Sequence, residues 1–183
     1  MGKAKKVLIS AFLLASCVIV QRLLAIRLPF ISIDFKFIPF MFSAILLGTK
    51  YATVIGITSD IVGRLMFPMS AYHPGFTLSA GLTGYLYGKF LYKNGRIEAD
   101  KKFLIRLILC VVTVTLVVNV CLTTVWVMQM TDKAANIILP IRFVKQAVMV
   151  PVQIIVMYLL TNKMQDSINS VKGNVRNDLF KEC

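Results

Sequence analysis

A run of 25 consecutive residues, from Leu107 to Thr131, contains no Asp, Glu, Lys, Arg or His. About 20 apolar residues in a helix cross the hydrocarbon core of a bilayer, so this run predicts a membrane-spanning helix. Apolar residues make up 57% of the chain and charged residues 16%, against roughly 45–50% and about 25% in soluble domains. The sequence therefore predicts an integral membrane protein, and we interpret its net charge of +13 as a signal of membrane topology rather than of nucleic-acid binding.

Further apolar stretches, interrupted by single charges, lie on both sides of this run. Together they predict six transmembrane helices, at about residues 7–27, 36–49, 51–66, 74–92, 104–130 and 140–162. These helices occupy most of the chain and leave no room for a soluble catalytic domain. We therefore expect an all-α, six-helix membrane domain over residues 1–163, followed by a cytoplasmic C-terminal tail over residues 164–183.

The Lys and Arg residues are shared unequally between the two sides of the predicted bundle. Fourteen fall on the side of the two termini and seven on the other, so the positive-inside rule places both termini in the cytoplasm. Most of the seven lie within or at the ends of spans, where a charge usually pairs or faces a cavity. They indicate an anion site near the outer face, unless single side chains extend to lipid headgroups. The seven are Arg22, Arg27, Lys36, Arg64, Lys133, Arg142 and Lys145.

Asp60 lies inside the third predicted span, where an unpaired carboxylate is costly. Arg64 follows one helical turn later, so one interpretation is an ion pair within the helix. The other interpretation is that Asp60 accepts two hydrogen bonds from the amidine-like edge of a heterocycle, with Arg64 fixing its orientation.

The segment from Phe67 to Ala80 is rich in aromatic, proline and polar residues. Pro68 and Pro74-Gly75 predict non-helical backbone, which at membrane depth occurs only where protein or a water-filled cavity satisfies it. Thr77 or Ser79 is expected to cap the helix that follows.

The aromatic residues of this segment, Phe67, Tyr72 and Phe76, have two interpretations. They predict either stacking on a flat ligand ring or an aromatic belt at the membrane interface. His73 is the only histidine in the chain, and we expect it to be a hydrogen-bonding loop residue rather than a metal ligand.

Small residues recur every four positions at Ala80, Gly84 and Gly88. Such a face allows close helix contact in lipid, either within the bundle or with a partner. Ala11 and Ala15 form a similar, weaker pair. The sequence contains no nucleotide-binding loop, carboxylate pair, nucleophile–histidine arrangement or metal-ligand cluster, so neither an enzyme nor a cofactor or metal is expected.

The chain resembles the substrate-binding S components of energy-coupling factor (ECF) vitamin transporters, most closely the folate-specific members. The resemblance covers residues 7–92, whereas the second half matches only in size and hydropathy. Before Pro74, the stretch Met69–His73 departs from the Gly-Pro-Tyr-Phe-like pattern of the family. The resemblance rests on Arg22–Ile26, Phe35–Pro39, Asp60–Gly63 and above all Pro74-Gly-Phe-Thr-Leu-Ser-Ala80.

The resemblance implies a six-helix bundle that captures folate near its outer face. It also implies a separate membrane coupling subunit and two ATPase subunits, so that ATP binds only to partners. In folate binding, the carboxylates are expected to bind to Arg22, Arg27 and Lys36. The pterin edge is expected to bind to Asp60, and the ring faces are expected to stack on Phe37, Tyr72 and Phe76. Other expected substrate contacts are Arg64, His73, Pro74, Gly75, Thr77, Ser79, Asn119, Trp126 and Lys145, and Ala11 and Ala15 are expected to contact the coupling subunit.

Two alternatives remain open. One is an S component for another cargo, such as pantothenate, which lacks the pterin edge, or a deazapurine, which lacks the carboxylates. The other is a structural membrane subunit without a ligand. The expected location is in each case a cell membrane, crossed several times and of a prokaryote.

Overall fold

The structure is a computed structural model, which describes residues 3–22, 26–27, 32–33, 35–66, 73–92, 100–131 and 135–180. Most of these residues are helical. The helices are α1 (Lys3–Arg22), α2 (Phe37–Leu47), α3 (Thr49–Met66), α4 (Pro74–Leu91), α5 (Lys101–Thr113), the π-helix η1 (Val114–Leu122), α6 (Thr123–Thr131) and α7 (Ala135–Phe180). The all-α class is confirmed, with the addition of a small hairpin in which β1 (Ile26–Arg27) pairs antiparallel with β2 (Ser32–Ile33).

Each range expected to form a membrane segment is helical over most of its length. The expected segment 104–130 is formed by α5, η1 and α6, which follow one another without a gap. Two stretches, Lys101–Gln129 and Phe143–Val171, are long and apolar enough to cross a membrane. The first helix differs from the expectation, because it ends at Arg22 and the chain then enters the hairpin.

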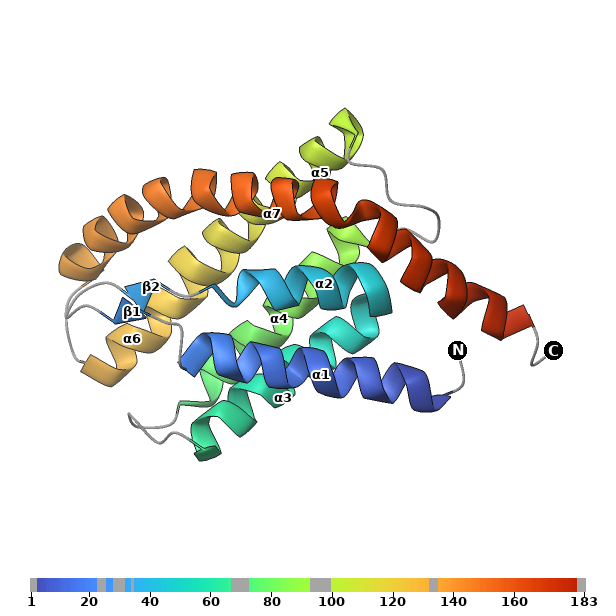
Figure 1. Cartoon of the computed structure of the whole chain (residues 1–183). Coiled ribbons are helices and arrows are strands. Elements are labelled where there is room, and N and C mark those ends of the chain that lie inside the picture. Colours follow the sequence, from blue (N-terminus) through green and yellow to red (C-terminus); the bar gives the residue numbers. More distant parts are fainter. Residues whose placement is uncertain are drawn as a thin grey trace.

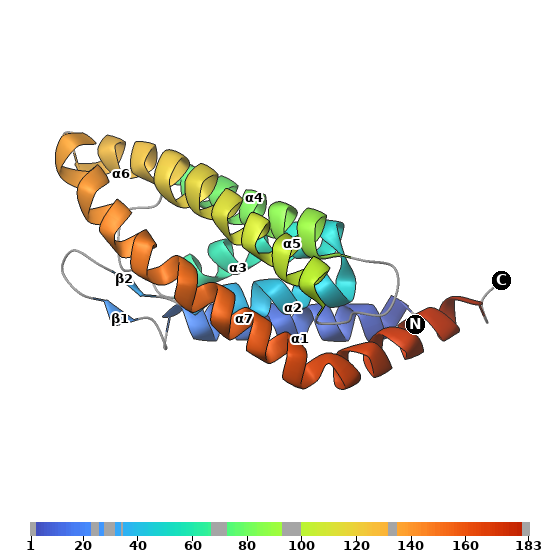
Figure 2. The same ribbon diagram turned by 90° about the horizontal axis from the view of Figure 1, so that it is seen from above.

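The helices form a bundle with two distinct ends (Figures 1 and 2). The start of α1 and the end of α7 lie at one end, and the hairpin lies at the other. Within the bundle α3 packs most extensively on α4, and α7 packs on α2 and α5. α7 is 46 residues long and continues as a helix through the region expected to be a polar tail.

Helices α3 and α4 approach each other at small residues. A Cβ atom added at Gly84 would overlap the carbonyl oxygen of Ala52, and one at Gly88 would overlap the Cα atom of Thr49. The predicted small-residue face therefore packs inside the bundle and is not available for docking a partner.

The turn between α2 and α3 depends on Gly48. Its φ angle of 86° lies in the left-handed region that favours glycine, and its N–H donates to the Ala44 carbonyl oxygen at 3.1 Å. This single residue ends α2 and lets α3 begin at Thr49. It explains why two short apolar segments follow each other directly in the sequence.

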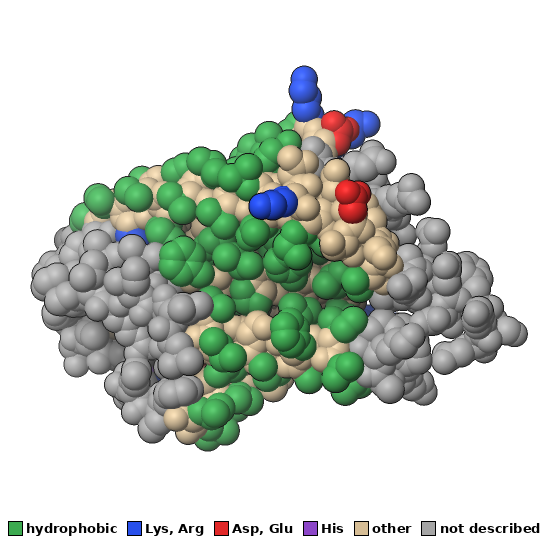
Figure 3. Space-filling view, in the orientation of Figure 1, with side chains coloured by type: hydrophobic (Ala, Val, Ile, Leu, Met, Phe, Trp, Pro, Cys, Tyr) green, Lys and Arg blue, Asp and Glu red, His purple; other side chains and the backbone are tan. Residues whose placement is uncertain are grey.

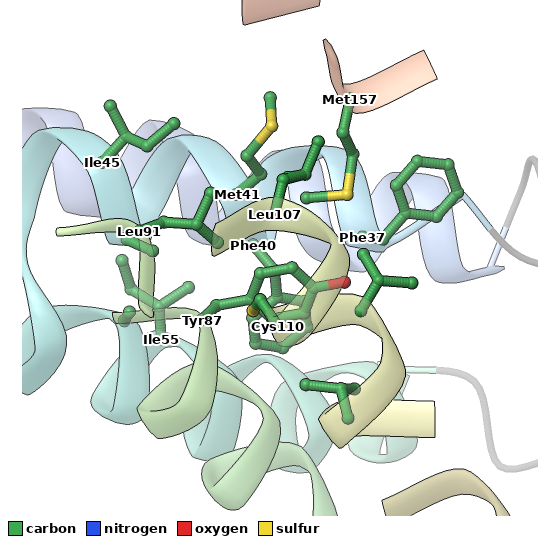
Figure 4. Packing of buried hydrophobic residues seen from close by; sticks show 14 of the residues in the cluster. Phe37, Phe40, Met41, Ile45, Ile55, Tyr87, Leu91, Leu107, Cys110 and Met157 are labelled. Atoms are coloured by element: carbon green, nitrogen blue, oxygen red, sulfur yellow. The ribbon is translucent and has the colours of Figure 1, made fainter. Parts of the chain in front are cut away.

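The hydrophobic core lies between α2, α4, α5 and α7 (Figure 4). Phe40 and Tyr87 stack with ring centroids 6.3 Å apart, and Met157 of α7 is fully buried near them. Cys110 belongs to the same cluster, where it packs as a small apolar residue. This packing fixes α7 against the first half of the chain.

The described surface is strongly apolar (Figure 3). Hydrophobic side chains dominate the face formed by α7, α2 and α1 in this view. Large exposed hydrophobic residues occur on several helices, among them Phe12, Leu65, Leu78 and Val148. Such a surface is unusual for a soluble monomer and suits contact with lipid.

The π-helix η1 interrupts an otherwise regular helical rod. It spans Val114–Leu122, and the Thr123 hydroxyl, just after it, donates to the Val118 carbonyl oxygen at 2.8 Å. π-helical turns are rare and often occur at functional sites. In this chain η1 borders the cavities described next.

Candidate ligand-binding site

A cavity of about 220 Å³ lies where α1 ends, α2 begins, α3 ends and α4 begins. This places it toward the end of the bundle that carries the hairpin. η1, α6 and α7 close its other side. Its lining consists of Gln21, Lys36, Asp60, Arg64, Phe76, Ser79, Ala80, Thr83, Val118, Asn119, Thr123, Lys145 and Gln146.

A smaller cavity of about 70 Å³ adjoins the first. It is additionally lined by residues closer to the hydrophobic core, including Phe37, Phe40, Tyr87 and Gln153. The two cavities share five lining residues, so they form two connected compartments of one site. The shared residues are Lys36, Thr83, Asn119, Lys145 and Gln146.

Asp60 is the buried carboxylate of the larger cavity, with 4% of its surface exposed. Its Oδ2 accepts a hydrogen bond from Arg64 Nε at 3.2 Å and another from Thr77 Oγ1 at 2.8 Å. The ion pair expected from the spacing is therefore confirmed. Both hydrogen bonds fall on Oδ2, and within the described part of the chain Oδ1 accepts none.

Arg64 also packs against an aromatic ring of α4. The central guanidinium carbon lies 5.1 Å from the centroid of the Phe76 ring, within the range of a cation–π interaction. Asp60 and Phe76 thus hold the guanidinium from two sides. A fixed cation, a buried carboxylate and an aromatic ring therefore meet at one wall of the cavity.

The start of α4 is capped by His73 rather than by Thr77 or Ser79. The His73 Nδ1 atom accepts a hydrogen bond from the Gly75 N–H at 3.1 Å, and Pro74 occupies the first helical turn. Because proline favours the first helical position, the helix begins before Thr77 and Ser79, and the expectation that one of them caps it is wrong. The expectation of His73 as a hydrogen-bonding residue outside the helix is confirmed.

Trp126 of α6 packs onto this helix start. Its ring lies 5.2 Å from the His73 ring, between centroids, and its Nε1–H donates to Ser79 Oγ at 3.1 Å. A Cβ atom at Gly75 would overlap the indole ring. Gly75 therefore provides the space that allows α6 to contact α4 beside the cavity.

The structure brings most of the predicted site residues together. Asp60, Arg64, Phe76 and Ser79 line the larger cavity, Phe37 lines the smaller one, and Lys36, Asn119 and Lys145 line both. Thr77, His73 and Trp126 contact these residues without appearing in the lining. Gly75 contacts His73 and Trp126, and Pro74 is exposed.

Some predicted residues fall outside what the structure describes. Tyr72 and Phe67 lie outside the described residues, as do the side chains of Arg22, Arg27 and Arg142. Their expected roles remain predictions.

The sequence analysis missed several neutral polar residues of the lining. Gln21, Thr83, Thr123 and Gln146 all border the larger cavity. Gln146 carried a usable signal, because polar residues within a membrane span usually face the bundle interior. The other three carried no comparable signal.

The arrangement is suited to binding rather than to catalysis. Lys36, Lys145 and Arg64 provide positive charge for an anionic ligand, Asp60 provides an acceptor, and Phe76 provides an aromatic face. Within the described residues, no three His, Cys, Asp or Glu side chains form a group that could hold a metal ion.

Comparison with protein families defines the class. The model of the family described as "ECF-type riboflavin transporter, S component" matches residues 1–166, and the chain belongs to this family of membrane transporter components. The family comprises transporter components and not enzymes.

Individual relatives point to a narrower group. The folate transporter FolT of Clostridium novyi (strain NT) is 37% identical over 158 residues, which cover 86% of this chain and 88% of the relative. The folate transporter FolT of Leuconostoc mesenteroides is 25% identical over 158 residues, 83% of this chain and 82% of the relative. The resemblance to S components is therefore confirmed.

A solved structure agrees in fold. The crystal structure of FolT bound with folic acid matches this chain with a TM-score of 0.78 and 34% sequence identity. The match covers 87% of this chain and 93% of the solved one. It therefore extends into the second half of the chain, where the sequence alone indicated only similar size and hydropathy.

Proposed function

We propose that this protein is the folate-binding S component of a bacterial ECF transporter. The observation that carries the proposal is the buried Asp60 in a cavity that also contains Lys36 and Lys145. Folate combines a pterin, whose guanidine-like edge offers two adjacent N–H donors, with a glutamate that carries two carboxylates. A carboxylate and several cations in one cavity match both ends of this molecule.

The pterin binds at the wall formed by α3 and α4. Asp60 accepts hydrogen bonds from the pterin edge, while Arg64 and Thr77 hold the carboxylate in place. Phe76 stacks on the ring. His73, Pro74, Gly75 and Ser79 lie at the start of α4 and shape this wall, and Tyr72, which precedes them in the sequence, is a further proposed ligand contact.

The glutamate carboxylates bind to the cations of the site. Lys36, together with Arg22 and Arg27, forms the carboxylate-binding group, and Lys145 adds a cation from α7. Phe37, Asn119 and Trp126 complete the contacts as an aromatic surface, an amide and a support for α4. The position of Lys36, Asn119 and Lys145 on both cavities supports this arrangement.

The protein crosses the bacterial cell membrane six times with both termini in the cytoplasm. The shared location of the start of α1 and the end of α7 supports this topology (Figures 1 and 2), as does the excess of Lys and Arg on that side. The cavity then lies toward the outer face, where it receives the vitamin. The C-terminal part of α7 extends into the cytoplasm.

Transport requires partners that couple binding to ATP hydrolysis. Membership of the S-component family implies a membrane coupling subunit and two ATPase subunits, and the lack of a nucleotide-binding loop in the sequence is consistent with ATP binding to such partners. The contact with the coupling subunit lies on α1, where Ala11 and Ala15 are exposed beside Leu8 and Phe12. Small residues on an exposed apolar helix allow close packing of a second helix in lipid.

Riboflavin is the second candidate, because the matching family carries its name. Its pyrimidine edge offers a single N–H between two carbonyl oxygens, which a carboxylate repels. Riboflavin also has no carboxylates to pair with Lys36 and Lys145. The charges of the cavity therefore favour folate.

Calorimetric titration of the purified protein with folate tests the proposal, with riboflavin, pantothenate and a deazapurine as competing ligands. Quenching of Trp126, the only tryptophan, provides an independent readout beside the cavity. We expect saturable, sub-micromolar folate binding that the other ligands do not displace. If another ligand binds more tightly than folate, that ligand is the cargo of the transporter. If no ligand gives saturable binding, a structural membrane subunit is the better description of the protein.

A further inference from the structure

Gln146 has a buried amide oxygen for which the described residues provide no hydrogen-bond partner. The residue is 9% exposed, and its Oε1 atom is buried without a hydrogen-bond partner within the described part of the chain. A buried amide oxygen without a partner loses its hydration and receives nothing in return. Such an atom in a native structure calls for a specific explanation.

The location of Gln146 supplies an explanation for its unpartnered oxygen. Two other buried hydroxyl oxygens lack partners in the described residues, those of Thr115 and Thr124, but neither residue lines either cavity. Gln146 lines both cavities. Its amide therefore lies at the junction of the two compartments, next in the chain to Lys145.

We propose that Gln146 is a specificity-determining residue that accepts a hydrogen bond from an N–H group of the bound ligand. The proposal rests on folate as the ligand. After Asp60 has taken the two N–H donors of the pterin edge, folate still carries N–H groups in its linker between the pterin and the glutamate. Riboflavin has a single N–H, on its pyrimidine ring, and its other donors are the hydroxyl groups of its ribityl chain.

The side chain can reach the ligand at low cost. The final torsion of a glutamine side chain has a broad energy profile, so the amide turns its oxygen toward the cavity without moving α7. A neutral amide at this point also complements Lys36 and Lys145, which act through charge. The lysines attract an anion, whereas Gln146 selects for a hydrogen-bond donor at a defined place.

The test compares Gln146→Met with Gln165→Met. Methionine has a similar length and removes the amide, and Gln165 is a matched control because it is a half-buried glutamine of the same helix that lines neither cavity. We expect Gln146→Met to weaken folate binding roughly five- to tenfold, as for the loss of one neutral hydrogen bond. Gln165→Met is expected to change the dissociation constant by less than about twofold.

Thermal unfolding without ligand distinguishes ligand binding from a structural role. Because the Gln146 oxygen is unsatisfied in the empty protein, Gln146→Met is expected to keep or raise the unfolding temperature while folate affinity falls. A lower unfolding temperature accompanied by weaker binding would overturn the inference in favour of a structural role. Folate binding within twofold of the wild type would also overturn it.

The wild type provides the remaining control. If the wild-type protein does not bind folate, the proposed function fails and this inference fails with it. If the wild type binds folate and Gln146→Met binds equally well, only the inference about Gln146 fails. The two failures are therefore distinguishable in one series of titrations.

Discussion

Thr77 of α4 donates a 2.8 Å hydrogen bond to Asp60 of α3, on the same carboxylate oxygen that accepts from Arg64 at 3.2 Å. Two donors from two helices thus fix the orientation of a carboxylate that is almost completely buried. Both bind Oδ2, whereas Oδ1 accepts no hydrogen bond from the described residues, and Asp60 lines the larger cavity. The carboxylate is therefore oriented before a ligand arrives, which lowers the cost of ordering it on binding.

Asp60→Asn tests this arrangement directly. The substitution removes the charge and one of the two acceptors, so two charge-assisted hydrogen bonds to the pterin are weakened or lost. We expect folate affinity to fall by about 100-fold, measured by calorimetry, while the helical content in circular dichroism remains unchanged.

Ser59→Ala is the matched control for Asp60→Asn. Ser59 is buried next to Asp60, but its hydroxyl donates to the Gly56 carbonyl oxygen of its own helix at 3.0 Å. Folate binding by Ser59→Ala is expected to stay within about threefold of the wild type. Equal binding by Asp60→Asn and the wild type, with both proteins folded, would remove Asp60 from the site.

Gly75→Ala tests the contact between α4 and α6. The added Cβ atom overlaps the Trp126 ring, so the indole has to move away from His73 and lose its hydrogen bond to Ser79. We expect a loss of about 1–3 kcal/mol in stability and a shift in the tryptophan emission spectrum.

Gly81→Ala provides the comparison for this variant. A Cβ atom at Gly81 meets Cγ1 of Ile57 at 2.8 Å, so the Ile57 side chain, which is 38% exposed, has to shift, but neither Trp126 nor backbone is displaced. The emission spectrum of Gly81→Ala should match that of the wild type. An unchanged spectrum for Gly75→Ala as well would show that Trp126 does not pack on the start of α4.

Gly84→Ala tests the close approach of α3 and α4. The new methyl group overlaps backbone, namely the carbonyl oxygen of Ala52, and backbone atoms of a packed helix cannot turn away as a side chain can. We expect the two helices to separate and the protein to lose about 2 kcal/mol or more of stability. Thermal unfolding in detergent measures this, and a melting temperature equal to that of Gly81→Ala would contradict it.

Replacing Ala11 and Ala15 together with tryptophan tests the proposed contact on α1. Both residues are exposed, and neither lines a cavity. Folate binding by the isolated protein is therefore expected to remain within about twofold of the wild type. Folate uptake with the coupling and ATPase subunits is expected to fall to background, because bulky side chains block close helix packing.

Val54→Trp is the matched control for the α1 variant. Val54 is an apolar residue of α3 with 60% of its surface exposed, so tryptophan at this position also faces outward. Uptake by Val54→Trp should resemble that of the wild type. If folate uptake by the α1 variant also equals that of the wild type, the coupling subunit binds to another face of this protein.

A helix could be predicted from the sequence where its signal lies within one continuous stretch of residues. The run Leu107–Thr131 contains no charged side chain, and a helix is the structure that satisfies its backbone within lipid. The hairpin at Ile26–Arg27 and Ser32–Ile33 has only two residues in each strand, too few for a pattern. The π-helix Val114–Leu122 differs from an α-helix in its hydrogen-bond spacing. The apolar composition of the run fits both kinds of helix and does not distinguish them.

The contacts of the site likewise include some that the sequence predicts and others that depend on helix packing. The Asp60–Arg64 pair follows from their spacing of one helical turn. The hydrogen bond from Thr77 to Asp60 spans 17 residues, and that from Trp126 to Ser79 spans 47, so both depend on how the helices pack. The position of Gln146 within a predicted span pointed to the bundle interior, but its unpartnered oxygen could be recognised only from the packing of α7 against η1 and α2.

The common location of the start of α1 and the end of α7, opposite the hairpin, has a practical consequence. A fluorescent protein or affinity tag fused at either terminus stands at the far end of the bundle from the cavity mouth. Such fusions permit immobilisation of the protein by this end, with the ligand supplied freely from the other. A sensor for the ligand therefore needs no insertion into the chain near the cavity.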